Sequence, residues 1–418
     1  MADNGYQPDV LIVGGGVIGV CTAYYLAKQG IGVTLVERDE ICAGSSYGNV
    51  GWIANGHAIP IAAPGVLTQG LKWLLDSGSP FYIKPRLNGA LLRWLWQFQA
   101  ACTDAHVRQS IPVLLALSQH SLELFEEIIT AEALACDFER KGLLHLFTTA
   151  DSFKKDVKEA KLLQQFGVES TELDADGVRD IEPNVLPAIR HGVYFPEYAH
   201  LNPHHFVLGL ADAARSHGAA LLPKTEVLTF ETGGRKITTV HTTRGSFRPR
   251  QVVLAAGAWS PLVSRELGLS LPVQPAKGYS ITVHAPPTGP LLPLSLIEHK
   301  VAVTPLGNLL RFSSTLELAG YDFSINQRRV AATRKAVQLY LPNLDAPEVL
   351  ELWRGFRPAS PDGLPIIGPA PGVENLMLAT GHGMLGITHG PVTGKLITQL
   401  LAGERPLFDI GPLRPERF

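Results

Sequence analysis

The sequence predicts an α/β fold with two interleaved domains, and three observations support this prediction. An apolar run at residues 10–13 leads into glycines spaced G-x-G-x-x-G and then into an apolar helical pattern. This strand–turn–helix order is typical of a Rossmann-like dinucleotide-binding unit. A second apolar strand running into a glycine turn follows much later, at 251–257. Residues 279–283 and 301–303 alternate in polarity, which indicates antiparallel strands.

These patterns divide the chain into two discontinuous parts. We expect a nucleotide-binding domain formed by residues 1–60, 196–265 and 354–418. An α+β substrate domain with an antiparallel sheet is expected to take up residues 61–195 and 266–353. At 418 residues with 45% hydrophobic content, the chain is long enough for two such lobes.

The glycine motif is the strongest local signal. Gly14 lets the chain turn sharply off the first strand, and Gly16 lets the backbone approach a pyrophosphate. Gly19 lets the following helix lie close to the strand. Val17 and Ile18 open that helix, whose free N–H groups and dipole attract phosphates.

The residues after the helix complete the motif. Gly30 and Gly32 end the helix, residues 33–36 form a second strand, and Glu37 follows directly. An acid about 20 residues beyond the glycines accepts a ribose hydroxyl in such sites. Arg38 has two interpretations, an adenosine contact or a surface charge. The sequence therefore predicts a dinucleotide site here.

The other elements follow from periodicity and capping signals. Long helical patterns occupy residues 88–100 and 110–130, and residues 191–195 read as a strand. Asn202 and Pro203 are the N-cap and first-turn proline of a further helix. Neighbouring strands are expected at 226–228 and 237–240, and the chain ends in a glycine-rich region and a helix. The mixed-charge run 154–161 is interpreted as a solvated helix face.

Composition excludes several functions. A formal net charge of −2 offers no basic footprint for nucleic acid. The four cysteines form no C-x-x-C pair, so neither zinc nor a disulfide framework is expected. His200, His204 and His205 lack an acidic or cysteine partner at ligand spacing, so no metal site is expected.

Localisation is predicted to be cytoplasmic. Residues 1–5 lack the basic region of a signal peptide, and no apolar run approaches the roughly 18 residues that span a bilayer. The aromatic runs at 91–98 and 73–75 admit two interpretations. They form either a peripheral contact with the inner face of the membrane or a packed core or interface.

The C-terminal part carries two further motifs. Residues 356–368 read F-R-P-A-S-P-D-G-L-P-I-I-G, and residues 381–386 read G-H-G-M-L-G. These resemble the C-terminal flavin-binding signature of the D-amino-acid oxidase superfamily, which includes glycine oxidase, sarcosine oxidase and D-amino-acid dehydrogenase. Residues 275–280, and 301–304 through Arg311 and Glu317, resemble the dehydrogenase branch.

The resemblance implies FAD as the cofactor. In sarcosine oxidases a cysteine near the position of residues 361–362 tethers the flavin, and no cysteine follows Cys136 here, so FAD is expected to be non-covalent. The resemblance assigns the cofactor contacts to Ser45, Ser46, Gly48, Asn49, Val50, Val227, Ala255, Ala256, Gly257, Trp259, Gly381, His382, Gly383, Met384, Leu385 and Gly386. The last six would place N–H donors near the flavin's pyrimidine oxygens, with His382 either a flavin contact or an ordinary loop residue.

The resemblance also implies substrate-binding residues. Arg357 matches the family arginine that binds the substrate carboxylate, as a planar guanidinium suits that group. Arg311 matches a strand position where some relatives place a second carboxylate-binding group. The tyrosine that glycine oxidase uses is not found, which leaves Tyr279, Tyr321 and His299 as candidates for its role. His57 either faces the substrate or has a structural role.

The implied reaction is hydride transfer from the substrate Cα to flavin N5. The imino acid formed hydrolyses to a 2-oxo acid and ammonia, and a quinone or dye accepts the electrons. D-amino acids are the expected substrates, with cyclic ones such as D-proline or hydroxyproline a plausible subset. Two alternatives stay open: an oxidase that releases hydrogen peroxide, with Lys277 or Lys300 supplying a charge near the flavin, and a non-catalytic flavoprotein subunit working beside partner chains.

Overall fold

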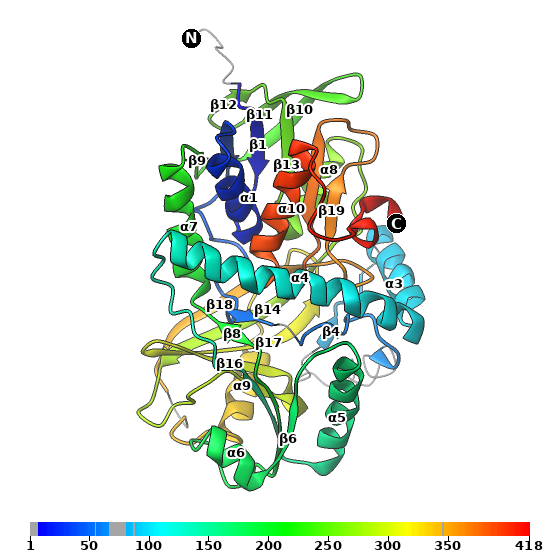
Figure 1. Ribbon diagram of the computed structural model, residues 1–418. Helices are drawn as coiled ribbons and strands as arrows, with labels where there is room; N and C mark the ends of the chain where they lie inside the picture. The colour runs from blue at the N-terminus through cyan, green and yellow to red at the C-terminus, as the bar shows by residue number, and fades with distance from the viewer. Residues whose placement is uncertain (1–6, 55, 67–80, 87, 345–346) are drawn as a thin grey trace.

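Two large sheets organise the structure. The computed structural model describes residues 7–54, 56–66, 81–86, 88–344 and 347–418. A mainly parallel sheet lies in the upper half of Figure 1, a large mixed sheet lies in the lower half, and the long helix α4 (Asp104–Ala131) runs between them. This α/β architecture is the predicted fold class.

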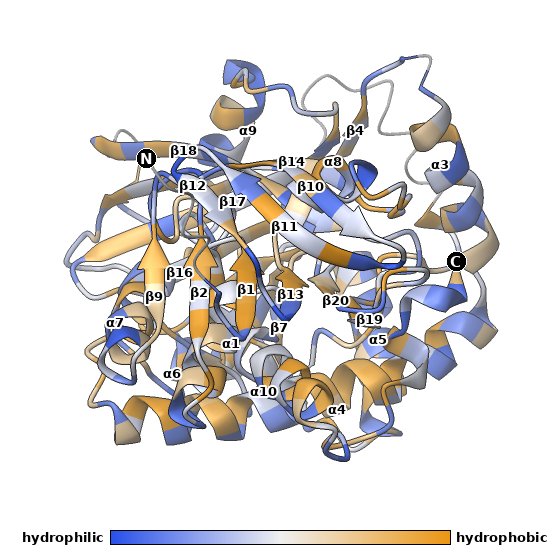
Figure 2. Cartoon of the chain, turned by 90° about the horizontal axis from the view of Figure 1, so that it is seen from above, coloured by the Kyte–Doolittle hydropathy of each residue, from blue (hydrophilic) through white to orange (hydrophobic). Residues whose placement is uncertain are grey.

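The first sheet has six strands, and all neighbours except β19 and β20 are parallel. Every residue of β1 and β2 is buried, as expected for a parallel sheet that is covered on both faces. Figure 2 shows its strands as a row of hydrophobic segments. In spatial order they are β19 (Ile366–Pro369), β20 (Leu376–Thr380), β13 (Gln251–Leu254), β1 (Val10–Val13), β2 (Val33–Val36) and β9 (Ala220–Leu222).

Helices cover one face of this sheet, and a small sheet covers the other (Figure 2). The helices are α1 (Val17–Lys28), α7 (Pro203–Ser216) and α10 (Gly390–Ala402). Helix α10 packs tightly on α1, because a Cβ at Gly394 would lie 2.6 Å from the carbonyl carbon of Cys21. The small antiparallel sheet contains β10 (Val227–Gly233), β11 (Lys236–Thr242) and β12 (Gly245–Phe247).

The second large sheet has nine strands. The predicted alternating strands are antiparallel, as β14 and β16 flank β17 on either side. Two pairs, β15 with β5 and β17 with β4, are parallel, so the sheet is mixed where we expected an antiparallel one. The strands are β18 (Val349–Ala359), β14 (Gln274–His284), β17 (Leu309–Leu318), β16 (Val301–Leu306), β15 (Leu294–Leu296), β5 (Leu143–Phe147), β7 (His191–Phe195), β6 (Thr171–Asp174) and β4 (Phe81–Ile83).

The remaining elements connect and flank the sheets. Asn202 caps α7 as predicted, accepting hydrogen bonds from the N–H groups of His204 and His205 at 3.2 and 3.3 Å. The mixed-charge run is more than a solvated face, because Asp156 and Val157 within it are buried. The other elements are α3 (Gly89–Ala101), α5 (Ala150–Gln164), α6 (Ala175–Ile181), α8 (Ser260–Arg265), α9 (Gln327–Gln338), β3 (Trp52–Ile53) and β8 (Ala199–His200).

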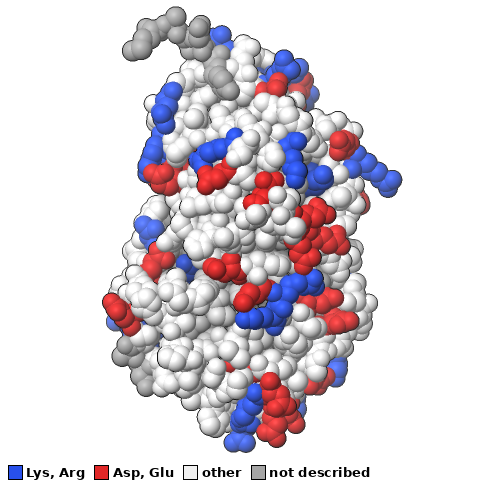
Figure 3. All heavy atoms as spheres, turned by 60° about the vertical axis from the view of Figure 1, so that its left-hand side comes forward, with Lys and Arg blue, Asp and Glu red and all other residues white. Residues whose placement is uncertain are grey.

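Strands of the parallel sheet come from three separated segments, 10–36, 220–254 and 366–380. The expected boundary at residue 354 falls inside β18, which pairs with β14 from Ala359 to Val349. We retain the two-domain division as a proposal, with β18 as the strand that passes from one domain into the other. On the face shown in Figure 3, basic and acidic side chains are interspersed.

Candidate active site

A continuous cleft of about 1340 Å³ reaches from the parallel sheet to the mixed sheet. It begins beyond the carboxyl ends of β1 and β2, where open α/β sheets bind ligands, and extends to residues of β16, β17 and β18. Most residues predicted to contact the cofactor line it: Gly14, Gly16, Val17, Ile18, Glu37, Arg38, Ser45, Ser46, Gly48, Asn49, Val50, Val227, Ala255, Ala256, Gly257, Trp259, His382, Gly383, Met384, Leu385 and Gly386.

The glycine turn is built so tightly that side chains do not fit. Gly14 has φ +118°, and a Cβ there would lie 2.5 Å from the carbonyl oxygen of Ala255. A Cβ at Gly19 would lie 1.9 Å from the carbonyl oxygen of Gly14. Gly19 is outside the cleft lining formed by the described residues, so its contribution is this close approach of helix to turn.

The N-terminus of α1 presents donors to the cleft. The Val17 N–H donates to Ser46 Oγ at 3.0 Å, whereas the Gly16 and Ile18 N–H groups have no partner in the part of the chain that the structure describes. Glu37 accepts from the Gly15 N–H at 2.7 Å and the Asp39 N–H at 2.9 Å. Each carboxylate oxygen keeps a second lone pair for a ribose hydroxyl. These groups fit the pyrophosphate and ribose of a dinucleotide.

Arg38 and Trp259 lie together in the cleft wall. The Arg38 guanidinium lies 4.4 Å from the centre of the Trp259 ring, and its Nε also pairs with Asp39 at 3.3 Å. Of the two interpretations of Arg38, this geometry favours a group that borders the cleft over an isolated surface charge.

Arg311 holds the loop of residues 45–50, which we call the flavin loop. Its Nη1 donates to the carbonyl oxygens of Tyr47 and Asn49 at 2.9 and 3.0 Å, and its Nε donates to Thr282 at 3.1 Å. Burial lowers the pKa of Arg311, while Glu351 raises it. The side chain lies outside the lining contributed by the described residues. This geometry favours a positioning role over the carboxylate contact that we expected.

The 381–386 loop also turns backbone donors toward the cleft. The Gly383 N–H donates to Pro358 at 2.9 Å and the Leu385 N–H to His382 at 3.0 Å. Within the described ranges the N–H groups of Met384 and Gly386 have no partner. The His382 ring shares a 2.9 Å hydrogen bond with Thr393 of α10, and burial lowers its pKa to about 3. The ring therefore fastens the loop to α10. Gly381, at φ +78°, packs against Ile366 and is not in the lining.

Arg357 is a cation in the cleft wall with no ion-pair partner among the described residues. Its Nη1 donates to the Thr315 carbonyl at 2.7 Å, and its Nη2 lies 3.4 Å from Ser313 Oγ. The guanidinium lies across Gly278, where a Cβ would be 2.0 Å from Nη1. Burial lowers the pKa of Arg357 to about 10. A cation that is partly removed from water and has no ion-pair partner among the described residues is costly, and a substrate carboxylate would relieve that cost.

Tyr279, Tyr321 and His299 lie outside the lining contributed by the described residues. The Tyr279 hydroxyl donates to Glu317 at 2.9 Å, and the Tyr321 hydroxyl donates to the Ala258 carbonyl at 2.7 Å. The His299 ring packs edge-on against Tyr340, with centroids 5.9 Å apart. None of the three is placed where it would meet a substrate carboxylate in this cleft, so the geometry does not favour their expected role.

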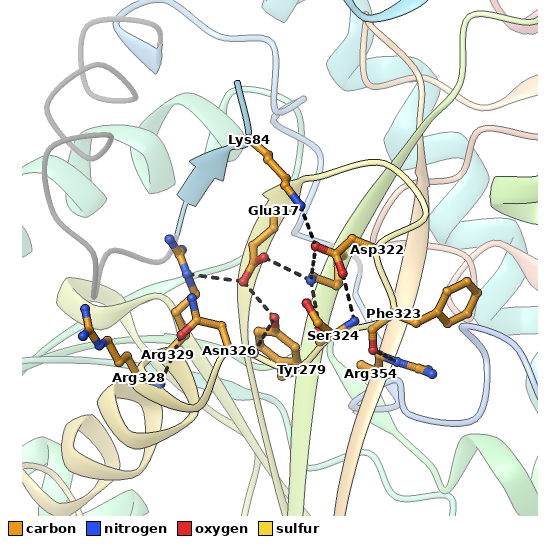
Figure 4. Close-up of polar contacts among 11 residues, drawn as sticks. Lys84, Tyr279, Glu317, Asp322, Phe323, Ser324, Asn326, Arg328, Arg329 and Arg354 are labelled. Atoms are coloured by element: carbon orange, nitrogen blue, oxygen red, sulfur yellow. Dashed lines mark hydrogen bonds and ion pairs between the residues drawn. The ribbon is translucent and has the colours of Figure 1, made fainter. Parts of the chain in front are cut away.

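Lys277 also points away from the cleft. Its Nζ donates to the Ser324 carbonyl at 2.9 Å and lies 3.3 Å from Glu317. Figure 4 shows the polar network around Glu317 and Ser324. The network fastens the segment that carries Phe323, which lines the cleft. Of the two lysines considered for oxygen activation, Lys300 lines the cleft.

His57 lies in the cleft wall, and its Nδ1 is 2.9 Å from the Tyr198 hydroxyl. Burial lowers its pKa to about 4, so the ring is neutral at pH 7. Beside it lies a pair that the sequence did not reveal, His145 and Asp156, joined at 2.9 Å. The two residues belong to β5 and α5, and no motif spacing links them. Only the tertiary structure identifies the pair.

Three comparisons place this chain among known proteins. A model of the family described as "FAD dependent oxidoreductase" (DAO) matches residues 9–400. D-amino acid dehydrogenase of Granulibacter bethesdensis is 34% identical, covering 98% of this chain and 99% of that protein. D-amino acid dehydrogenase of Vibrio atlanticus is 33% identical, covering 94% and 96%.

Solved structures agree with these sequence matches. Glycine oxidase from Geobacillus kaustophilus superimposes with a TM-score of 0.79 at 25% identity, covering 99% of both chains. L-proline dehydrogenase from P. horikoshii gives the same TM-score at 19% identity, covering 99% of this chain and 98% of that one. The second likeness is one of fold alone.

Proposed function

The chain belongs to the FAD-dependent oxidoreductase family, and from this premise we propose that it oxidatively deaminates D-amino acids. The observation that carries the proposal is Arg357, whose guanidinium has no ion-pair partner among the described residues and lines the same cleft as the glycine turn. An amino acid brings the carboxylate that this cation lacks. The named relatives support D-amino acids as the substrate class.

The cleft fits FAD on its own geometry. The turn at Gly14 and Gly19 has no room for a Cβ. The N–H groups of Gly16 and Ile18, which have no partner among the residues the structure describes, suit a pyrophosphate. Met384 and Gly386 offer N–H donors at the other end, within the part that the structure describes. When bound, FAD supplies the acceptor for the hydride that leaves the substrate Cα.

The protein's own residues bind and orient the substrate. Arg357 would clamp the carboxylate and thereby fix the direction of the Cα–H bond. His57 is neutral at pH 7 because burial lowers its pKa to about 4, so it does not repel an incoming ammonium group. Phe356 lines the cleft and is buried, so it helps to keep water out of the cleft. The imino acid then hydrolyses to a 2-oxo acid and ammonia.

Product analysis tests this proposal. Purified holoenzyme supplied with a D-amino acid and a quinone analogue should form 2-oxo acid and ammonia in equal amounts, with no turnover of the L-isomer. Turnover of the L-isomer alone would contradict the stereochemical assignment. Formation of neither product with any D-amino acid would contradict the activity.

The electron acceptor distinguishes a dehydrogenase from an oxidase. We propose a quinone or similar acceptor, because the relatives carry the name dehydrogenase. One observation favours the oxidase alternative: Lys300 lines the cleft and supplies a cation. Rapid hydrogen peroxide release in air, faster than reduction of a quinone analogue, would establish the oxidase.

Helix α3 links the cleft to the surface. Trp94 and Phe98 line the cleft, whereas Leu92 and Trp96 are 58% and 70% exposed. We propose that this exposed side makes a peripheral membrane contact through which a lipid-dissolved quinone reaches the protein. No helix within the described ranges has the length and apolarity to cross a bilayer, and residues 73–75 lie outside those ranges.

Flotation with phospholipid vesicles tests this contact. The wild-type protein should float with the vesicles, and Trp96→Gln should reduce the bound fraction. Binding that is absent in the wild type, or unchanged in Trp96→Gln, would contradict the assignment to α3.

A further inference from the structure

The register of the mixed sheet aligns one row of residues along the cleft floor. Ser313 of β17 pairs with Ala302 of β16, which pairs with Ser295 of β15, which pairs with His145 of β5. All four residues line the cleft. The side chains of Ser313, Ala302 and Ser295 are short, so the row forms a trough. Arg357 lies over the Ser313 end, and His145 lies at the other end.

The length of this trough suits an extended side chain. Three strand spacings separate β17 from β5, which is about 14 Å. An extended lysine spans about 8 Å from carboxylate to ammonium, and hydrogen bonds at its two ends add about 6 Å. A long amino acid held by Arg357 would therefore reach His145, whereas alanine would not.

Asp156 orients the His145 ring through one nitrogen, and the other ring nitrogen has no hydrogen-bond partner among the described residues. Its Nδ1 lies 2.9 Å from Asp156 Oδ2. A carboxylate only accepts hydrogen bonds, so Nδ1 is the donor to Asp156 and Nε2 is the ring nitrogen left for a substrate. Nε2 is buried and has no hydrogen-bond partner among the described residues. Buried polar atoms are normally hydrogen-bonded, and a hydrogen-bond donor on a substrate would be the missing partner of Nε2.

The charges around His145 favour a cation. The carboxyl groups of Asp156 and Glu159 line this end of the cleft, and Lys300 also belongs to the lining. His57 packs against His145 with ring centroids 6.4 Å apart and is neutral at pH 7. Carboxyl groups at this end of the cleft offer acceptors to an ammonium or guanidinium group of a substrate.

We propose that the trough is the side-chain subsite and that His145, held by Asp156, hydrogen-bonds the terminal cation of a long basic D-amino acid. This inference rests on the proposed function and adds a substrate class to it. His145 is a specificity-determining residue in this account, and the short side chains of Ser295 and Ala302 keep the path to it open.

Matched substrates test the inference on the holoenzyme. D-norleucine has the carbon skeleton of D-lysine without the ammonium, and D-alanine reaches only the Arg357 end. Wild-type kcat/KM should favour D-lysine over D-norleucine by about tenfold or more. His145→Phe should lower that ratio by about 10- to 100-fold, as expected when a hydrogen bond to a charged group is lost.

Two further variants separate recognition from misfolding. Asp151→Asn, an exposed position on the same helix, should leave the ratio unchanged, while Asp156→Asn should lower it. If His145→Phe fails to bind FAD, Ser295→Val narrows the trough without removing the histidine and should penalise D-lysine relative to D-alanine. Flavin content and the unfolding temperature report whether each variant is folded.

The outcomes distinguish this inference from the proposed function. Equal kcat/KM for D-lysine and D-norleucine in the wild type, with D-alanine still oxidised, would overturn the inference and leave the function intact. A ratio that His145→Phe does not change would also overturn it. Failure of all three D-amino acids to reduce the enzyme would contradict the function itself.

Discussion

At the residue scale, the site is defined by charged and polar groups that lack an ion-pair or hydrogen-bond partner within the described part of the chain. Arg357 is such a group, since it bonds only Thr315 and Ser313 within the described part of the chain. The sequence predicted it because it lies in a recognisable motif. The positioning role of Arg311 and the place of His145 in the cleft could not be predicted, because both depend on tertiary contacts that no motif specifies.

Replacement of Arg357 tests the carboxylate assignment. Arg357→Ala should lower kcat/KM for D-amino acids by about 100- to 1000-fold, since a charge-assisted bidentate contact is lost. The kcat/KM of Arg357→Lys should lie between those of the wild type and Arg357→Ala, because an ammonium keeps the charge but lacks the planar fork of a guanidinium. Steady-state kinetics and flavin content measure both effects. Arg328→Ala, on α9 away from the cleft, is the control, and normal kinetics in Arg357→Ala would refute the assignment.

Replacement of Gly19 tests the cofactor cradle. The new Cβ of Gly19→Ala would lie 1.9 Å from the Gly14 carbonyl oxygen, so the turn must shift and FAD affinity should fall about tenfold or more. The flavin-to-protein ratio after dialysis measures this. Gly89→Ala is the matched control, because nothing lies within 4 Å of its Cβ position. Full flavin retention by Gly19→Ala would contradict the account.

At the element scale, local patterns predicted strands, turns and helices well, and long-range pairing poorly. The strand–glycine–helix unit and the cap at Asn202 follow from adjacent residues. The parallel pairing of β5 with β15 joins segments about 150 residues apart, and no local signal specifies it. The expected boundary at residue 354 lies inside β18, whose pairing with β14 is also long-range.

Replacement of Arg311 tests whether this side chain of β17 holds the flavin loop in place. Arg311→Met should leave the carbonyl oxygens of Tyr47 and Asn49 without their donor, which costs about 1–3 kcal/mol per buried group. The loop should loosen and FAD affinity should fall. Equilibrium binding of FAD to the apoprotein measures this. If Arg311 instead binds the substrate carboxylate, KM would rise while FAD affinity stays unchanged.

At the scale of the whole molecule, buried histidines link stability to pH. Burial lowers the pKa from 6.5 to about 4 at His57 and His200, and to about 3 at His382 and His389. The unfolded chain therefore binds more protons than the folded one once the pH falls below 6.5. Stability should decrease from pH 6.5 down toward the folded pKa values, by a few kcal/mol per histidine and up to roughly 5 kcal/mol where the pKa falls to about 3.

Chemical unfolding across this pH range measures the effect. The free energy of unfolding should be level above pH 6.5 and decline below it, and His389→Gln, which does not ionise, should show a shallower decline. An unfolding free energy that does not change below pH 6.5, or a slope that His389→Gln leaves unaltered, would contradict the assigned cause.

The central claim is that D-amino acids deliver a hydride to FAD in this cleft. The most direct measurement mixes the holoenzyme anaerobically with D- and L-amino acids, glycine, sarcosine and cyclic imino acids, and follows the visible absorption band of oxidised flavin. The account predicts rapid bleaching by D-amino acids, no bleaching by their L-isomers, and recovery that is faster with a quinone analogue than with air. Failure of every D-amino acid to bleach the band would contradict the account.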